Sequence, residues 1–486
     1  MQQRKTRLDI LAEKAAGRAR TLRRGVLISL CERIAPVDPL EALESMDSAL
    51  TPDRMFWAVP DNSVAFAAAG SAGIFEHSGH DRFARTNKDL RDHLSDAVIE
   101  GAPAGLAAAG PVLVGGFSFD EDGPRTELWS GFGSSRLFLP AVMVTAVNDE
   151  TWLTLNAIVG EDGACNPPIE SLAHLADRVS ESSSSLSFEA QRDTVIRFDE
   201  ADEGAGFVSL VAEAVSEIER GEFQKVVLAR TESGEADADI DAFATVRNLL
   251  AVHRRAFVFA LWNGEKVFVG ASPELLARQD GRTVYASSLA GTIERGSTPE
   301  ADSAKVEMLR SSEKDLAEHA AVRNELYDVL SVMCDDVIAP EVPTLLTLSN
   351  VHHLHTPLSA TLRNGGSLLD IVERLHPTPA VGGAPRDAAL RFIHEHEALD
   401  RGWYAGPIGW IGGDKGEFAV ALRSALVDGD EATLFAGCGI VRDSDPESEL
   451  DESNLKLQAM KSALGAALVS QSQEPVEMSS AGENDS

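Results

Sequence analysis

Along the first 190 residues, hydrophobic and polar positions alternate in short runs that predict strands joined by turns. The first run differs, because residues 5–22 place their apolar side chains at helical spacing and predict an amphipathic helix. Serine fills much of residues 180–190, which predicts a surface loop between two parts of the chain. The strands are predicted at residues 25–34, 112–120, 137–144 and 151–155, the last two bridged by Asn148-Asp149-Glu150.

The pattern changes at Gly204, after which longer helical repeats alternate with apolar strands. In residues 207–220 the apolar side chains recur every three or four positions, which predicts a helix buried along one face. Thr298 and Pro299 are typical of an N-cap and a first helical residue, so one long helix is expected at 299–333. Further helices are predicted at 239–253 and 368–375, and strands at 225–229, 257–262, 267–270 (a hairpin across Asn263-Gly264) and within 403–440.

The chain of 486 residues has a formal net charge of −34. Such a field repels phosphate backbones, so no nucleic-acid partner is expected. The length suggests two or three domains, although one large mixed sheet can span it as a single unit. The tail from Gln471 has four acidic residues, no basic ones and no periodicity, and is expected to be disordered.

Cysteine usage and hydropathy point to the cytoplasm. The four cysteines form no C-x-x-C motif, which disfavours a zinc site or a redox pair and fits a reducing compartment. No apolar run reaches the length of a membrane span, so no membrane partner is expected. Arg23-Arg24 precedes a short apolar run that Glu32 interrupts, which is not the pattern of a cleaved signal.

Two residues are candidates for acid–base chemistry. Lys225 opens an apolar strand, where a lysine most often extends its amine to water. If that lysine is buried it loses its charge more readily and can act as a base. Glu274 follows Ser272-Pro273, a pair typical of a helix start. Its alternative role is that of a general acid on a backbone that the proline makes rigid.

Carboxylates at helical spacing are candidates for metal ligands. Glu318 lies in the long predicted helix, and Glu449 and Glu452 share a face of a later one. Solvated acids are common on helices, but inward-facing ones would suit Mg2+. His353 and His355 lie on the same side of a strand and suggest a metal pair, yet no third nitrogen ligand accompanies them, so zinc is not expected.

Glycines, prolines and two cations are candidates for ligand contacts. Gly291 and Gly439 would let backbone amides approach a ligand, although Gly291 also fits a simple turn. Arg423 alternates out of an apolar strand and would need an anionic partner if buried, and Lys456 is a base on the face of the later acids. Residues 376–386 hold three prolines and two glycines, a rigidity that commonly shapes a site.

Taken in this order, the motifs resemble the chorismate-utilising enzymes over residues 201–464, somewhat over half of the chain. That family includes the large subunit of anthranilate synthase, aminodeoxychorismate synthase, salicylate synthase and isochorismate synthase. The resemblance implies an α/β (α+β) sandwich of large, mainly antiparallel sheets with outer helices, as in the anthranilate synthase large subunit. Residues 1–200 would be the family's variable part of the same fold, with Gly115-Gly116-Phe117 as the clearest match, and 465–486 a disordered acidic tail.

Three positions discriminate within the family. Ammonia-using members carry Gln where this chain has Lys225, which is the residue of the water-adding members. Aminodeoxychorismate synthases often carry a nucleophilic Lys where this chain has Ala290. Anthranilate and salicylate synthases usually have Thr where this chain has Ala380, as isochorismate synthases do. The resemblance therefore implies an isochorismate synthase, which serves menaquinone or siderophore biosynthesis.

The resemblance also implies a role for each candidate. Lys225 would activate water for attack at C2 of chorismate, and Glu274 would protonate the departing C4 hydroxyl. Mg2+ would be held by Glu318 and Glu452, with Glu449 close by, and would offset the charge of the dianionic substrate. A monomer without a glutaminase subunit is expected. Substrate contacts would come from Gly291, His353, Ala380, Arg423, Gly439 and Lys456.

Three alternatives stay open at this point. A salicylate synthase shares Lys225 and Glu274 and differs mainly at Ala380. An anthranilate synthase-like enzyme with a glutaminase partner is disfavoured by Lys225. A relative that binds its ligand without turnover is disfavoured because both acid–base candidates and the acids of the predicted metal site are present.

Overall fold

The computed structural model describes residues 2–46, 48, 51–62, 64–103, 105–181, 196–198, 204–347 and 351–465. The described strands form one hydrogen-bonded network that divides into two arms. The division lies at β6 (Ser135–Val147), whose first residues pair with β5 (Leu113–Phe117) and whose later residues pair with β7 (Glu150–Val159). Strand β3 (Val64–Glu76) follows the other edge of β6 and bends at a bulge between Ser71 and Gly73.

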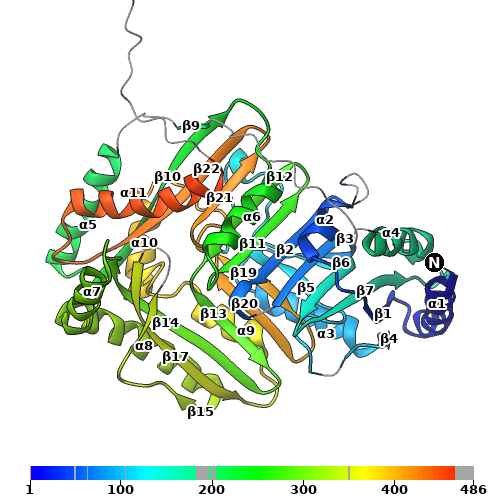
Figure 1. Ribbon diagram of the computed structural model, residues 1–486. Coiled ribbons are helices and arrows are strands. Elements are labelled where there is room, and N and C mark those ends of the chain that lie inside the picture. Colours follow the sequence, from blue (N-terminus) through cyan, green and yellow to red (C-terminus); the bar gives the residue numbers. More distant parts are fainter. Residues whose placement is uncertain are drawn as a thin grey trace, which may run out of the picture.

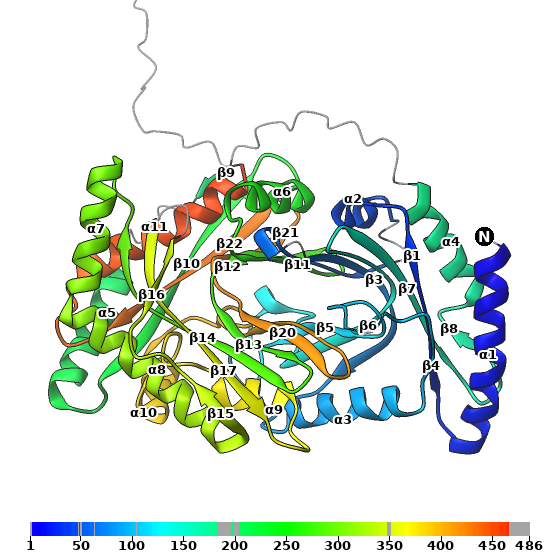
Figure 2. The same ribbon diagram turned by 60° about the horizontal axis from the view of Figure 1, so that its bottom comes forward.

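Each arm alternates strands from distant parts of the sequence (Figures 1 and 2). The first arm runs from β3 through β2 (Asp53–Val59), β11 (Phe257–Asn263), β12 (Lys266–Ser272), β21 (Ser424–Asp428) and β22 (Glu431–Ile440) to β10 (Lys225–Ala236). The second runs from β5 through β19 (Pro407–Ile411), β20 (Lys415–Val420), β13 (Leu275–Asp280) and β14 (Thr283–Glu294) to β17 (Val351–Leu362).

Short strands complete the edges. Strand β1 (Val26–Ile34) pairs with β7 and, in the one parallel pair among the described strands, with β4 (Val98–Glu100). The others are β8 (Cys165–Asn166), β9 (Ile196–Phe198), β15 (Cys334–Ile338), β16 (Thr344–Thr347) and β18 (Gly383–Ala384). This mainly antiparallel, two-armed arrangement confirms the predicted α+β sandwich.

Alternation along the strands builds two core layers. Trp57 of β2 and Phe259 of β11 lie in the same core cluster as Phe418 of β20, so the two arms pack on each other. The intervening residues Phe56 and Ala260 belong to a second cluster on the outer face of the first arm. The helices that contribute to this second cluster are α1 (Gln2–Leu22), α2 (Pro39–Glu44), α4 (Ile169–Glu181), α6 (Ala242–Val252) and α11 (Pro446–Ala463).

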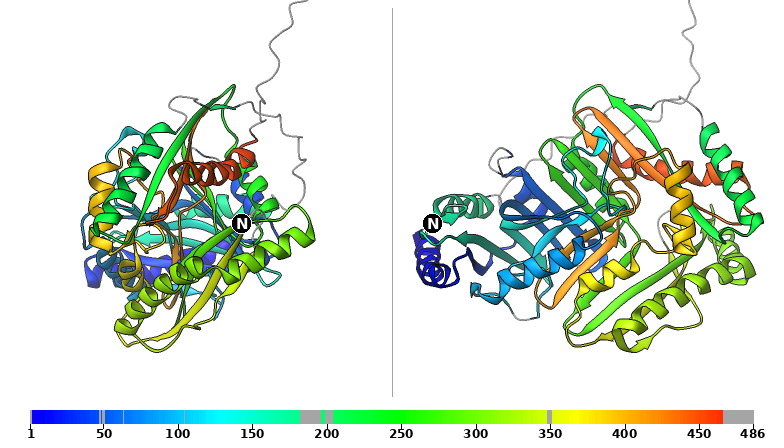
Figure 3. Two further views of the ribbon diagram at one scale, coloured as in Figure 1. Left: turned by 90° about the vertical axis from the view of Figure 1, so that its left-hand side faces the viewer. Right: turned by 180° about the vertical axis from the view of Figure 1, so that it is seen from behind.

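The remaining helices flank the second arm and the far end of β10. Figure 1 shows α5 beside α11 at one end of the molecule and α1 with α4 at the other, and Figure 3 shows the same elements from the side and from behind. Their bounds are α3 (Arg82–Ser95), α5 (Ala205–Arg220), α7 (Pro299–Ser311), α8 (Glu313–Met333), α9 (Leu368–Leu375) and α10 (Arg386–His396).

Most predicted elements are confirmed, and two need correction. The long helix expected at 299–333 is two helices, because Ser312 leaves helical geometry and its hydroxyl caps the backbone N–H of Asp315 at 3.2 Å. The hairpin turns at Gly264-Glu265, since Asn263 pairs with Lys266. The predicted loop at 180–190 lies outside the described residues except for its first two, which end α4, and the predicted tail from Gln471 lies wholly outside them.

The two parts expected from the sequence share both arms of the sheet. Strand β2 pairs with β11, and β5 pairs with β19, so each arm joins a strand from before residue 200 to one from after it. Within the described residues, no helix is long and apolar enough to cross a membrane.

Candidate active site

A cavity of about 390 Å3 lies where β10 and β22 of the first arm meet β14 and β17 of the second. Helices α8 and α11 and the segment around Ala380 complete its wall. Every candidate site residue from the sequence lines this one cavity: Lys225, Glu274, Gly291, Glu318, His353, Ala380, Arg423, Gly439, Glu449, Glu452 and Lys456.

Lys225 lies inside this cavity and not at the outer surface. Its side chain is 12% exposed, and its Nζ donates a hydrogen bond to Glu318. It passes over Gly439 on the neighbouring strand, where an added Cβ would lie 2.8 Å from Cε and 3.2 Å from Nζ of the lysine. Only glycine at that position leaves room for the lysine, so Gly439 serves Lys225 by its lack of a side chain.

Glu274 begins no helix; it lies in the turn between β12 and β13. The Ser272 hydroxyl accepts the Glu274 N–H at 3.2 Å and donates to the Val420 carbonyl, which fixes this turn. The residue is 5% exposed, and burial raises the pKa of Glu274 to about 7. The Thr378 hydroxyl, 3.4 Å from Oε1, and the charge of Lys225 oppose this effect only in part. A carboxyl group with this pKa can be protonated near neutral pH and serve as an acid.

Helix α11 presents the later acids and Lys456 to the cavity, as their spacing predicted. Its N-cap Asp445 accepts the N–H of Ser448 at 3.0 Å. Lys456 donates to Glu452 and to the Gly437 carbonyl, each at 2.7 Å, and its charge lowers the pKa of Glu452. Burial, with a contribution from Glu452, raises the pKa of Glu449.

Helix α8 brings Glu318 to the opposite wall. The next residue, His319, is buried and bonds the Thr356 hydroxyl at 2.8 Å and the Ala290 carbonyl at 3.3 Å. These two bonds fasten the helix to β17 and β14. The break at Ser312 sets where α8 begins, and the new first turn places Asp315 on the cavity as well.

The carboxylates on this cavity fit a divalent cation. Glu449 and Glu452 lie with Cys438 in a group whose potential ligand atoms are within 4.8 Å of one another. The thiol of Cys438 packs in the core with α5 and α10, and sulfur is a poor ligand for a hard ion. The glutamates therefore offer the oxygen atoms that could hold such an ion, with Glu318 lining the same cavity, and oxygen ligands suit Mg2+.

Arg423 supplies a positive charge to the cavity. Its backbone adopts a left-handed conformation, with φ of 49°, directly before β21. Among the described residues its guanidinium has no hydrogen bond and no ion pair within 4 Å. Tyr404, which sequence analysis missed, lines the same wall and stacks on Phe435 with ring centroids 5.3 Å apart. A buried tyrosine among apolar residues gives no local signal of such a position.

His353 faces the cavity in its neutral form. Burial, with smaller effects from Arg423 and Lys456, lowers its pKa to about 3. Its Nδ1 shares a hydrogen bond of 2.8 Å with the Thr292 hydroxyl, while its buried Nε2 has no partner among the described residues. A buried nitrogen without a partner is costly, so Nε2 is available to a ligand.

Backbone features complete the wall. Gly291 is the extra residue of a bulge between Ala290 and Thr292, and its φ of 77° is one that residues with a side chain rarely adopt. Ala380 is half-buried, and its neighbour Val381 is buried.

Comparison with known proteins shows the family of the chain. A family model described as "Chorismate binding enzyme" matches residues 12–465. The chain belongs to the chorismate-binding enzyme family. It is 36% identical to "Isochorismate synthase MenF" of Bacillus subtilis, over 95% of this chain and 98% of that protein. It is 38% identical to "Salicylate biosynthesis isochorismate synthase" of Pseudomonas aeruginosa, over 93% of each chain.

The solved structure of MenF from Escherichia coli, titled the menaquinone-specific isochorismate synthase, has the same fold. It superposes with a TM-score of 0.74 at 25% identity, covering 93% of this chain and 99% of that one. The match to the chorismate-binding family therefore includes the N-terminal part as well as the region that carries the motifs.

Proposed function

We propose that the protein is an isochorismate synthase, which adds water at C2 of chorismate while the C4 hydroxyl leaves. The observation that carries this proposal is the placement of Lys225 and Glu274, a base and an acid, on one cavity that also presents carboxylates and cations. Two relatives that match over most of their length are named isochorismate synthases, which supports the same activity. Ala290 and Ala380 lie on the cavity too, where the family's covalent-lysine and pyruvate-eliminating members differ.

Chorismate is held by the cations and the unpaired polar atoms of the site. Arg423 has no partner within the described part of the chain, and Lys456 is paired with Glu452 but has further N–H donors. Both can therefore bind carboxylates of the substrate. Nε2 of His353 is free to bond a polar atom of the ligand. These groups reverse, locally, the field of a protein whose net charge is −34.

The metal of this proposal is Mg2+, held by Glu452 and Glu318 with Glu449 close by. When bound it neutralises the ring carboxylate of chorismate and the crowded glutamates. Glu318 is the present hydrogen-bond partner of Lys225. Lys225 must be neutral to accept a proton from water.

The proton transfers follow from the two residues. Neutral Lys225 takes a proton from water as the water oxygen bonds to C2. The ring double bonds shift, the C4–O bond breaks, and Glu274 donates its proton so that hydroxide leaves as water. One water enters and one leaves, so the reaction is an isomerisation. Solvent then returns a proton to Glu274 and removes one from Lys225.

Product identification tests the proposal. Incubation with chorismate and Mg2+ is expected to give isochorismate as the main product by chromatography. EDTA is expected to stop turnover and excess Mg2+ to restore it, because the carboxylates alone repel the dianion. Salicylate with pyruvate, or a fluorescent amine formed only with ammonia, would contradict the proposal.

Substitution of Gly439 tests the position of Lys225. In Gly439→Ala the new methyl group displaces the lysine side chain, and kcat is expected to fall by up to about 10²-fold while KM changes less. Gly413→Ala is the control, because a Cβ there meets its nearest atom, in Leu94, at 3.9 Å. A wild-type kcat in Gly439→Ala would show that catalysis does not depend on the present position of the Lys225 side chain.

The compartment and assembly state belong to the same proposal. The four cysteines are free thiols, as a reducing cytoplasm would keep them. We propose a cytoplasmic monomer that needs no glutaminase subunit, because Lys225 stands where ammonia-using members carry Gln.

A further inference from the structure

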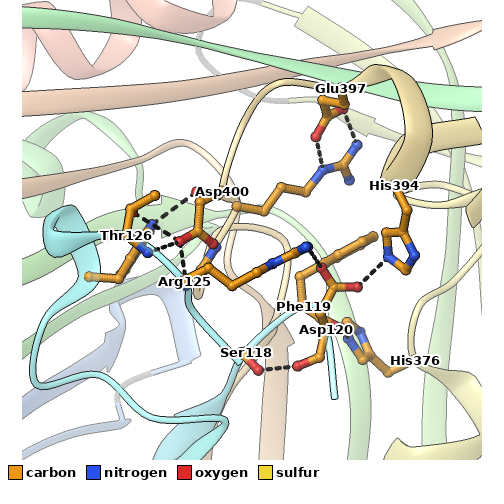
Figure 4. Close-up of polar contacts among 12 residues, drawn as sticks. Ser118, Phe119, Asp120, Arg125, Thr126, His376, His394, Glu397 and Asp400 are labelled. Carbon is orange, nitrogen blue, oxygen red and sulfur yellow. Dashed lines mark hydrogen bonds and ion pairs between the residues drawn. The ribbon is translucent and has the colours of Figure 1, made fainter. Parts of the chain in front are cut away.

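We propose that the buried ion pair between Glu397 and Arg401 is a positioning device that ties the strand of Lys225 to the segment of Ala380. Both side chains are only 2% exposed. Arg401 donates from Nε and Nη2 to the two carboxylate oxygens of Glu397, at 2.6 and 2.7 Å. Figure 4 shows Glu397 receiving these two bonds. This inference rests on the proposed function.

The pair also holds three backbone groups. Arg401 Nη2 donates to the Val227 carbonyl at 2.7 Å, and Nη1 donates to the Val381 carbonyl at 3.0 Å. The second oxygen of Glu397 accepts the N–H of Ala229 at 2.9 Å. Val227 lies two residues after Lys225, and Val381 directly follows Ala380. One guanidinium therefore joins the two segments that carry the proposed base and a specificity position.

The pair takes the place of a missing strand. One edge of β10 is paired with β22 along its length. On the other edge, β18 pairs with residues 225 and 226, and β9 with residues 234–236. The Val227 carbonyl and the Ala229 N–H lie between these stretches. Arg401 and Glu397 supply the donor and the acceptor that a neighbouring strand would otherwise supply.

Surrounding contacts fix the pair from the other side. The guanidinium of Arg401 lies over the ring of Phe119, 4.4 Å from its centroid. The carboxylate of Asp400 accepts hydrogen bonds from the backbone N–H groups of Arg125 and Thr126, at 2.6 and 2.7 Å (Figure 4). Phe119, Arg125 and Thr126 thus hold Arg401 and its neighbour Asp400 in place. An ion pair with so many bonds loses its geometry when either partner is shortened.

Arg401→Lys is the direct test, because lysine keeps the charge opposite Glu397 but cannot bond the carboxylate and both carbonyls in the plane of a guanidinium. We expect kcat for isochorismate formation to fall by about 10²-fold with KM within about threefold, since Arg423 and Lys456 are untouched. Amide exchange at Ala229 and in residues 381–384 is expected to become faster. Arg363→Lys is the control for the bonding pattern, because Arg363 also bonds a carboxylate and two backbone carbonyls, at a half-exposed position away from the cavity.

A second variant separates positioning from mere stability. Glu397→Leu with Arg401→Met removes both charges together, so no unpaired ion is left in the core, at the cost of three side-chain-to-backbone bonds. We expect a folded protein whose kcat stays as low as that of Arg401→Lys. Wild-type kcat and exchange in either variant would overturn the proposal, as would a rise in KM alone, which would make Arg401 a substrate contact. If the wild type makes no isochorismate, the proposed function fails, while the exchange measurement still tests the pair.

Discussion

Lys225→Gln is expected to lower the rate of isochorismate formation by about 10²- to 10⁴-fold, the usual contribution of a positioned general base. Glutamine is one bond shorter than lysine, keeps a polar end and cannot take a proton from water at neutral pH. The variant also frees Glu318 from its ion pair and leaves the cations that bind the substrate in place. Single-turnover assays with chromatographic detection of isochorismate measure the chemical step directly.

Chorismate binding separates a lost base from a damaged site. Calorimetric titration of Lys225→Gln with chorismate and Mg2+ is expected to give a dissociation constant within about fivefold of the wild-type KM, because Arg423 and Lys456 keep their places. Lys88→Gln is the charge-matched control, since Lys88 is exposed on α3 and pairs with Asp92 of the same helix. A Lys225→Gln rate within about threefold of wild type would remove Lys225 from the role of base.

The sequence identified the chemistry of the site more fully than its geometry. Lys225, Glu274 and the acids of α11 stand at element boundaries or on one helical face, where local patterns are strong. Their common cavity could be inferred only through the family resemblance, because it joins strands that lie up to about 200 residues apart in the chain. The pairing of β2 with β11 and of β5 with β19 likewise has no local signal.

Two other differences have local physical reasons. Serine is tolerated within a helix as well as at its start, so the apolar pattern does not distinguish Ser312 from a residue inside a helix. Only the acidic residues that follow it indicate the new N-terminus. Glu397 and Arg401 are four residues apart, a spacing that normally indicates an exposed pair on one helix. Helix α10 ends at His396, so the pair lies beyond it and turns inward to the backbone of β10.

Glu274→Gln is expected to reduce kcat by about 10²- to 10⁴-fold, because glutamine can donate a hydrogen bond but no proton to the leaving hydroxyl. In the wild type, the acid form of Glu274 is lost as pH rises through its pKa of about 7. The pH profile of kcat/KM is therefore expected to fall above about pH 7, and this descending limb should be absent from the residual activity of Glu274→Gln.

Glu417 provides a matched control for this limb. It is a second buried carboxyl group whose pKa burial raises to about 7, but it bonds Trp57 and lies outside the cavity. Both groups bind a proton more tightly in the folded state, so each contributes stability that is full below about pH 4.5 and is lost as pH rises to about 7. Glu274→Gln and Glu417→Gln should each flatten the dependence of the unfolding free energy on pH across that window. Only Glu274→Gln should remove the descending limb from the pH profile of kcat/KM. If the limb remains in Glu274→Gln, a group other than Glu274 is the acid.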